Sequence, residues 1–193
     1  MNIPNFLSLL RIILVPVFVI FLIHQEYNNA LITFVIAGLT DVLDGTIARL
    51  LNAQTKLGSY LDPIADKLLL TTSFVILAIL GIIPSWLTVI VISRDFIILL
   101  GIAILSLMSI NFEIKPAFIG KVTTVLQIAA VFFSLLNKAV IHDLNLNILK
   151  AELPVWILAL FFLTASFSVA SGLVYIARGI KIINSNTSKD GDI

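Results

Sequence analysis

Apolar residues fill six long stretches of the chain, and short polar segments separate them. The stretches cover about residues 5–23, 30–51, 63–83, 85–108, 116–137 and 154–177. A helix needs about 20 predominantly apolar residues to cross the hydrocarbon of a bilayer, so each stretch is long enough to span a membrane. Short connections favour antiparallel neighbours. The pattern therefore predicts an all-α membrane protein, a bundle of six transmembrane helices.

Composition supports this fold class and excludes some chemistry. The 193 residues are 60% hydrophobic and 12% charged, and none is cysteine. Disulfides, thiolate catalysis and cysteine-bound metals are therefore excluded. No small-residue cleavage site follows the first apolar stretch, so it is predicted to be a retained span. Residues 1–183 are predicted to form one helical domain, and the polar residues 184–193 a disordered tail.

Basic residues in the connecting segments predict the orientation. With six spans both termini share one side, which receives most of these residues, while the other side receives Lys138 and Lys150. Positive charge accumulates on the cytoplasmic side of membrane proteins. Both termini are thus predicted to face the cytoplasm, with the protein in the cytoplasmic (inner) membrane. The residues on the terminal side are Arg49, Lys56, Lys115, Lys121, Arg178, Lys181 and Lys189.

Four aspartates, Asp41, Asp44, Asp62 and Asp66, lie where the second stretch gives way to the third. An aspartate in the middle of a membrane helix costs about 2.5–3.5 kcal/mol on the insertion scale. In helices, the spacings i, i+3 and i, i+4 place each pair on one face. Four neighbouring carboxylates repel one another unless cations intervene, and oxygen ligands suit Mg²⁺ or Mn²⁺. The pattern therefore predicts a divalent metal site that also binds substrate phosphates.

Each of these residues also has a structural alternative. Asp62 before Pro63 fits a helix N-cap, with proline at the first helical position. Gly45 and Ala48 fit close helix packing, and Arg49 fits an ion pair with a nearby aspartate. Such roles do not explain all four aspartates together, because no basic set of equal size lies nearby.

The spacing resembles the signature of the CDP-alcohol phosphatidyltransferases, D-x-x-D-G-x-x-A-R, eight residues, then G-x-x-x-D-x-x-x-D. The resemblance extends over nearly the whole chain. It implies a polar cavity open to the cytoplasm, a lateral groove for diacylglycerol chains, and a homodimer. The matching residues are Asp41, Asp44, Gly45, Ala48, Arg49, Gly58, Asp62 and Asp66.

The resemblance also implies roles for these residues. The four aspartates would hold two divalent cations, Mg²⁺ or Mn²⁺, on the pyrophosphate of CDP-diacylglycerol, and Asp66 would also act as the general base. Gly45, Ala48, Arg49 and Gly58 match positions around the cytidine nucleotide.

The amino terminus "IPNFLSLLR" is similar to the opening of the same family. Ser8 stands where threonine is more usual. The similarity implies that Asn5 and Arg11 lie beside the nucleotide. For Arg11, a side chain that snorkels to the membrane interface is an equal alternative.

Three cations are candidates for binding the phosphate of the acceptor. Arg94 lies well inside the fourth stretch, where an unpaired charge is costly. Neighbouring residues do not share a helical face, so Asp95 is predicted not to pair with Arg94. Arg94 is then predicted to bind an acceptor phosphate, with pairing to another helix as the alternative. Lys121 follows a glycine as in the family's glycerol phosphate-type enzymes, and Lys115 equally fits a solvated loop charge.

Within the family, the resemblance is greatest to the phosphatidylglycerophosphate synthases. It implies transfer of a phosphatidyl group from CDP-diacylglycerol to the hydroxyl of glycerol 3-phosphate, with release of CMP. Arg94-Asp95 and Ile102 depart from that branch, and "ISRD" instead resembles the CMP-forming cardiolipin synthases, whose acceptor is phosphatidylglycerol. Other classes are a membrane prenyltransferase, which lacks D-x-x-D-G-x-x-A-R, or an ion transporter, which would spread its carboxylates through the membrane depth.

Overall fold

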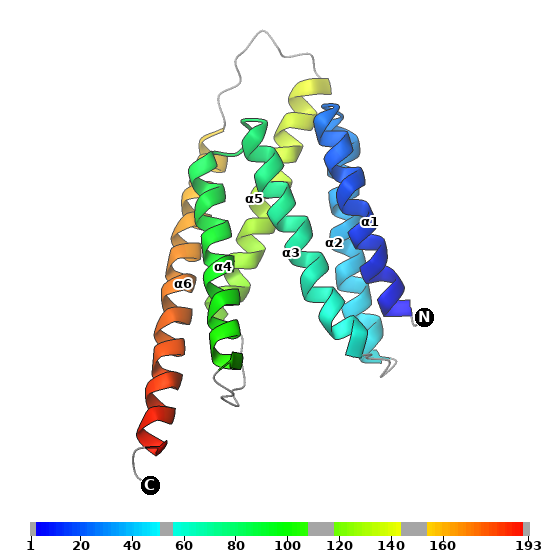
Figure 1. Ribbon diagram of the computed structural model, residues 1–193. Coiled ribbons are helices and arrows are strands. Elements are labelled where there is room, and N and C mark those ends of the chain that lie inside the picture. Colours follow the sequence, from blue (N-terminus) through cyan, green and yellow to red (C-terminus); the bar gives the residue numbers. More distant parts are fainter. Residues whose placement is uncertain (1–2, 51–55, 108–117, 144–153, 191–193) are drawn as a thin grey trace.

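The structure, a computed structural model, describes residues 3–50, 56–107, 118–143 and 154–190. For residues 3–8, 41–50, 56–66, 106, 142–143, 183 and 185–190 it describes the helices but not the side chains. Over the described ranges the chain forms six α-helices and no strands (Figure 1). The helices are α1 (Ile3–Ile23), α2 (Tyr27–Leu50), α3 (Lys56–Ile79), α4 (Ser85–Leu107), α5 (Phe118–Asp143) and α6 (Val155–Asp190).

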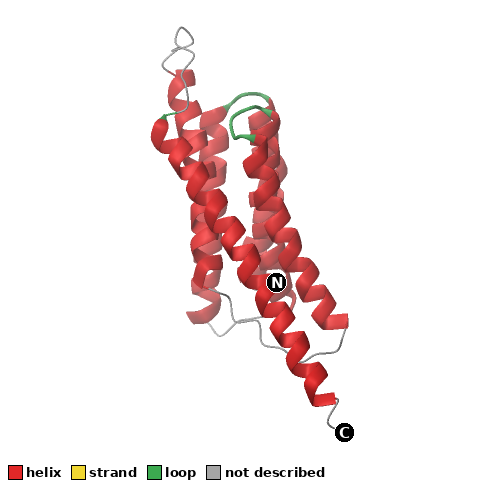
Figure 2. Cartoon of the chain, turned by 90° about the vertical axis from the view of Figure 1, so that its left-hand side faces the viewer, coloured by secondary structure: helices red, strands yellow, loops and turns green. Residues whose placement is uncertain are grey.

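Successive helices run antiparallel, as the short connections predict (Figure 1). Helix α1 packs against α2 and α3, α6 packs against α4 and α5, and α5 joins the two groups through α2. The C-terminal end of α2 and the N-terminal end of α3 lie at the end of the bundle where α1 begins and α6 ends. Figure 2 shows that α6 extends beyond the other helices there. We call this the aspartate end of the bundle.

The apolar core lies toward the opposite end, where α1 meets α2 and α3 meets α4. The Phe18 and Phe34 rings are in contact there, with their centroids 5.9 Å apart. The buried Arg11 precedes Phe18 in α1, which begins at the aspartate end, and the buried Arg94 and Asp95 follow Leu87 in α4, which runs toward that end. An apolar packing region thus supports a more polar region. Further core residues are Leu22, Phe74, Leu77, Ile82, Ile83, Leu87, Leu135, Ile157 and Phe161.

The outer surface of the bundle is strongly apolar. Within the described residues, three helical segments are long and apolar enough to cross a membrane: Ser85–Leu105, Phe118–Ile141 and Val155–Ile182. Helices α1, α2 and α3 contribute shorter apolar segments there. Large aliphatic and aromatic side chains are exposed on all six helices. So much exposed apolar surface is typical of contact with lipid.

Two helix boundaries differ from the sequence prediction in ways that affect the site. Helix α3 begins at Lys56, well before the predicted start at Pro63, so Asp62 lies inside the helix. The N-cap interpretation of Asp62 is therefore wrong. Helix α6 continues to Asp190, whereas the sequence predicted a non-helical tail from residue 184.

Helix α3 also ends earlier than predicted, at Ile79. Gly81 has a φ of 69°, and its N–H donates to the Ala78 carbonyl at 3.0 Å. A glycine in this left-handed conformation is a common helix C-terminus because it has no Cβ to clash. The buried Ile82 and Ile83 follow directly and anchor the turn between α3 and α4 in the core.

Candidate active site

The four aspartates lie on two helices that both pack against α1. Asp41 and Asp44 belong to the last part of α2, and Asp62 and Asp66 belong to the first half of α3. Because α3 begins at Lys56, Gly58, Asp62 and Asp66 all lie within regular helix. Residues three or four apart in a helix share a face. The backbone therefore places Asp41 with Asp44, and Asp62 with Asp66, on one face of their helix. Their side chains lie outside the described residues.

The other signature residues also fall in these helices. Gly45, Ala48 and Arg49 belong to α2, and Asn5 belongs to the first turn of α1. Their side chains, like those of the aspartates, lie outside the described residues, and so does the whole of Lys115. Their predicted contacts with a nucleotide or a phosphate stay predictions.

Arg11 is fully buried, at 0% exposure, in the helix that contacts both α2 and α3. A side chain that snorkels to a membrane interface keeps its charged head in water. The interfacial alternative for Arg11 is therefore wrong. A guanidinium inside the bundle needs polar or anionic company, and its helix faces both acidic helices. This placement agrees with a position beside a nucleotide.

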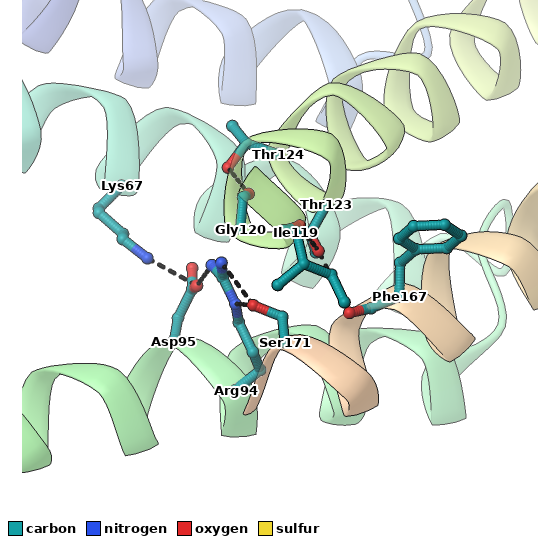
Figure 3. A network of polar contacts seen from close by, with 9 residues as sticks. All are labelled: Lys67, Arg94, Asp95, Ile119, Gly120, Thr123, Thr124, Phe167 and Ser171. Atoms are coloured by element: carbon teal, nitrogen blue, oxygen red, sulfur yellow. Dashed lines mark hydrogen bonds and ion pairs between the residues drawn. The ribbon is translucent and has the colours of Figure 1, made fainter. Parts of the chain in front are cut away.

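Arg94 lies at the centre of a buried polar network that joins α4 to α3 and α6 (Figure 3). Its Nη1 donates to Oδ1 of Asp95 at 2.5 Å, and its Nε and Nη2 donate to Ser171 Oγ at 3.3 and 3.2 Å. The prediction that Asp95 does not pair with Arg94 is wrong. The arginine side chain is long enough for its guanidinium to reach the carboxylate of the next residue (Figure 3). A difference in helical face therefore does not keep the two charged groups apart.

Lys67 completes this network and was missed by the sequence analysis. Its Nζ lies 2.6 Å from Oδ1 of Asp95, the same oxygen that accepts from Arg94. Lys67 directly follows Asp66, and Asp95 directly follows Arg94. The sequence therefore did contain a signal for this ion pair. Lys67 and Asp95 carry opposite charges, and each is the neighbour of a candidate site residue. We call Lys67, Arg94, Asp95 and Ser171 the Arg94 network.

Helix α5 supplies the wall behind the Arg94 guanidinium. A Cβ added at Gly120 would lie 3.4 Å from Arg94 Nη2 and 3.1 Å from the Tyr175 hydroxyl. One turn further on, Thr123 Oγ1 donates to the Ile119 carbonyl at 2.7 Å and to the Phe167 carbonyl of α6 at 3.2 Å (Figure 3). Gly120 thus permits a close approach of α5 to the network. Lys121, the next residue, is exposed.

The donor set fits hard divalent cations by its chemistry. The four aspartates offer only oxygen ligands, on two helices whose consecutive ends lie at the same end of the bundle, and oxygen ligands suit Mg²⁺ or Mn²⁺. Among the side chains that the structure describes, no group of three His, Asp or Glu residues is placed to hold a metal. The described side chains thus offer no competing metal site, and the signature aspartates remain the candidates.

Comparison with known proteins decides the family. A profile of the CDP-alcohol phosphatidyltransferases matches residues 1–167. The chain belongs to this family. The prediction made from the aspartate signature is therefore confirmed, and the protein is a phosphatidyltransferase of the CDP-alcohol type. Family membership and the apolar helices together make it an integral membrane protein.

Relatives of two kinds match the chain. It is 32% identical over 203 residues to the CDP-diacylglycerol--glycerol-3-phosphate 3-phosphatidyltransferase of Bacillus subtilis, covering 96% of this chain and 98% of that one. A probable phosphatidylglycerophosphate synthase of Mycobacterium tuberculosis is 31% identical, covering 94% of this chain and 83% of that one. The human CMP-forming cardiolipin synthase is 39% identical over 150 residues, 69% of this chain. The chain spans about half the length of that human relative.

Proposed function

We propose that the protein transfers a phosphatidyl group from CDP-diacylglycerol to the hydroxyl of glycerol 3-phosphate and releases CMP. The observation that carries this proposal is the complete aspartate signature in the helical registers of α2 and α3. Two relatives whose own length the chain also covers almost entirely, from Bacillus subtilis and Aquifex aeolicus, are named for this reaction. Family membership also favours phosphatidyl transfer over the prenyltransferase and transporter alternatives.

The chemistry assigns a task to each acidic residue. Asp41, Asp44, Asp62 and Asp66 would hold two divalent cations, which would neutralise the pyrophosphate and stabilise the departing CMP. Asp66 accepts the proton of the acceptor hydroxyl. The acceptor oxygen then bonds to the lipid-side phosphorus, and the bond from that phosphorus to the CMP oxygen breaks.

The remaining candidate residues divide between the nucleotide and the acceptor. Arg49, Asn5 and Arg11 bind the cytidine nucleotide, with Gly45, Ala48 and Gly58 leaving room for it. The burial of Arg11 supports its part of this assignment, since a buried cation favours an anionic ligand. Arg94, Lys121 and Lys115 bind the acceptor phosphate. The full set of proposed nucleotide and acceptor contacts is Asn5, Arg11, Gly45, Ala48, Arg49, Gly58, Arg94, Lys115 and Lys121.

The remaining features of the proposal concern the membrane. All six helices span the cytoplasmic membrane, and the aspartate end opens to the cytoplasm. The helix arrangement supports this orientation because the aspartate end also holds the basic segment around Arg178 and Lys181. Diacylglycerol chains enter laterally from the lipid, and the protein works as a homodimer.

A second candidate function is cardiolipin synthesis from phosphatidylglycerol. The human relative of that name is 39% identical over its matched region. The Arg94–Asp95 ion pair also favours it, because the carboxylate reduces the positive charge available for a dianionic acceptor. The chain covers most of the length of the relatives named for glycerol 3-phosphate transfer or phosphatidylglycerophosphate synthesis but only about half of the human cardiolipin synthase, so cardiolipin synthesis is the second candidate.

Release of CMP by the purified protein tests the proposed reaction. CDP-diacylglycerol is supplied with glycerol 3-phosphate, phosphatidylglycerol, serine or inositol phosphate separately. We expect CMP with glycerol 3-phosphate, loss of the reaction in excess chelator, and recovery on adding Mg²⁺ or Mn²⁺. Undiminished turnover in chelator would exclude the metal assignment.

A further inference from the structure

The Arg94 network brings two cationic head groups to a single oxygen atom. Lys67 Nζ approaches Oδ1 of Asp95 from α3 at 2.6 Å, and Arg94 Nη1 approaches it from α4 at 2.5 Å (Figure 3). Two cations held against one oxygen repel each other, and the shared carboxylate offsets the repulsion. Asp95 therefore allows an ammonium and a guanidinium from different helices to converge.

Burial shows that Lys67 is the more accessible of the two cations. The side chains of Arg94 and Asp95 are 8% and 11% exposed, whereas the Lys67 side chain is 39% exposed. Ser171 of α6 holds two further nitrogens of Arg94, and Gly120 of α5 lies against its guanidinium. Arg94 is thus fixed by three helices, and Lys67 covers the accessible side of the network.

The position of Lys67 in the chain connects the network to the aspartates. Lys67 directly follows Asp66, so the Lys67 ammonium is anchored one residue from the group proposed to take the acceptor's proton. The three charged side chains Lys67, Arg94 and Asp95 together carry one net positive charge. A phosphate group held by them would lie beside α3, the helix that carries Asp66.

We infer that Lys67 is the second cation of the acceptor site and that Asp95 is its positioning residue, holding Lys67 and Arg94 together as one receptor for the acceptor's phosphate. This inference rests on the proposed function, and it specifies which residues bind the phosphate of the acceptor. The ligand is a phosphate group joined to an alcohol, either the monoester of glycerol 3-phosphate or the diester of phosphatidylglycerol. Asp95 acts through the two cations and does not contact the substrate.

Kinetics of the purified full-length protein in lipid nanodiscs test the inference. The variants are Asp95→Asn, which keeps the shape and removes the charge, Asp95→Glu, which restores the charge, and Lys67→Gln. Glu26→Gln and Lys138→Gln are the matched controls, since both residues lie away from the aspartate end. The KM for glycerol 3-phosphate, for phosphatidylglycerol and for CDP-diacylglycerol is measured for each variant.

We expect Asp95→Asn and Lys67→Gln to raise the acceptor KM on the order of 10- to 100-fold, the usual loss for a charge-assisted contact. The KM for CDP-diacylglycerol should stay near its original value, and Asp95→Glu should recover most of the acceptor affinity. The acceptor whose KM responds identifies the source of the phosphate. An unchanged acceptor KM with only a lower kcat would overturn the inference, because a merely structural role predicts that result. An equal rise in the KM for the acceptor and the KM for CDP-diacylglycerol would also overturn the inference.

Binding of glycerol 3-phosphate without CDP-diacylglycerol separates this inference from the proposed function. The measurement needs no turnover and includes wild type and Lys67→Gln. Weaker binding by the variant supports the inference even if no CMP forms. Phosphatidylglycerol is tested in the same way, and equal binding of both acceptors by the two proteins contradicts the inference even if the reaction proceeds as proposed.

Discussion

Gly120→Ala provides a sharp test of the close approach between α5 and the Arg94 network. The added Cβ would lie 3.1 Å from the Tyr175 hydroxyl and 3.4 Å from Arg94 Nη2. Both neighbours are the ends of flexible side chains, so they are able to yield by a few tenths of an ångström without disturbing the helices. The substitution should therefore preserve the fold and displace the guanidinium.

The expected magnitude follows from two opposing effects. Alanine is favoured over glycine in a helix by about 1 kcal/mol, which offsets the cost of the crowding. A charge-assisted hydrogen bond contributes about 1.5–3 kcal/mol, so a partial misalignment that loses about 1 kcal/mol weakens acceptor binding about fivefold. Thermal stability should thus stay nearly constant while the KM for the acceptor rises.

Gly101→Ala is the matched control, because nothing lies within 4 Å of a Cβ added to Gly101 in α4. Both variants gain the same helix propensity, and only Gly120→Ala crowds the network. The assay compares the acceptor KM, the KM for CDP-diacylglycerol and the melting temperature in detergent. If Gly120→Ala and Gly101→Ala show the same acceptor KM, the guanidinium is not part of the acceptor site.

Three further substitutions test individual assignments. Asp66→Asn should slow CMP release on the order of 10²–10⁴-fold while CDP-lipid binding partly survives, and near-normal turnover would exclude an essential base. Arg11→Met should weaken CDP-diacylglycerol binding more than Arg11→Lys does, measured by the KM for the donor; equal effects would contradict a charge-based role for this buried residue. Lys121→Ala should raise the KM for glycerol 3-phosphate roughly 10-fold or more and spare the donor KM, and no change would remove Lys121 from the acceptor site.

Much of the fold was predictable because membrane helices have a simple sequence signal. Long apolar stretches separated by short polar segments correctly predicted six helices over the described residues, in antiparallel order. The early start of α3 was not predicted, because a proline at residue 63 usually marks a first turn. In α3 the helix continues through Pro63 from Lys56. The register of the aspartates depends on this continuation.

The candidate site was only partly predictable, and the difference lies in long-range contacts. The aspartate signature is local in the chain, so spacing alone identified it. The Arg94 network joins Lys67, Arg94 and Ser171, which are distant in the sequence and meet only through helix packing. The helical-face rule failed for Arg94 and Asp95 because it treats side chains as short and rigid. A long, flexible guanidinium reaches its neighbour's carboxylate.

The identity of the phospholipid product tests the central claim most directly. Purified protein in vesicles receives CDP-diacylglycerol, a divalent cation, and glycerol 3-phosphate and phosphatidylglycerol in competition, and mass spectrometry identifies the new lipid. The account predicts phosphatidylglycerophosphate, formed in equal amount to CMP and absent from the Asp66→Asn reaction. Cardiolipin as the product would replace the proposed acceptor with phosphatidylglycerol, and the absence of any new phospholipid would contradict phosphatidyl transfer itself.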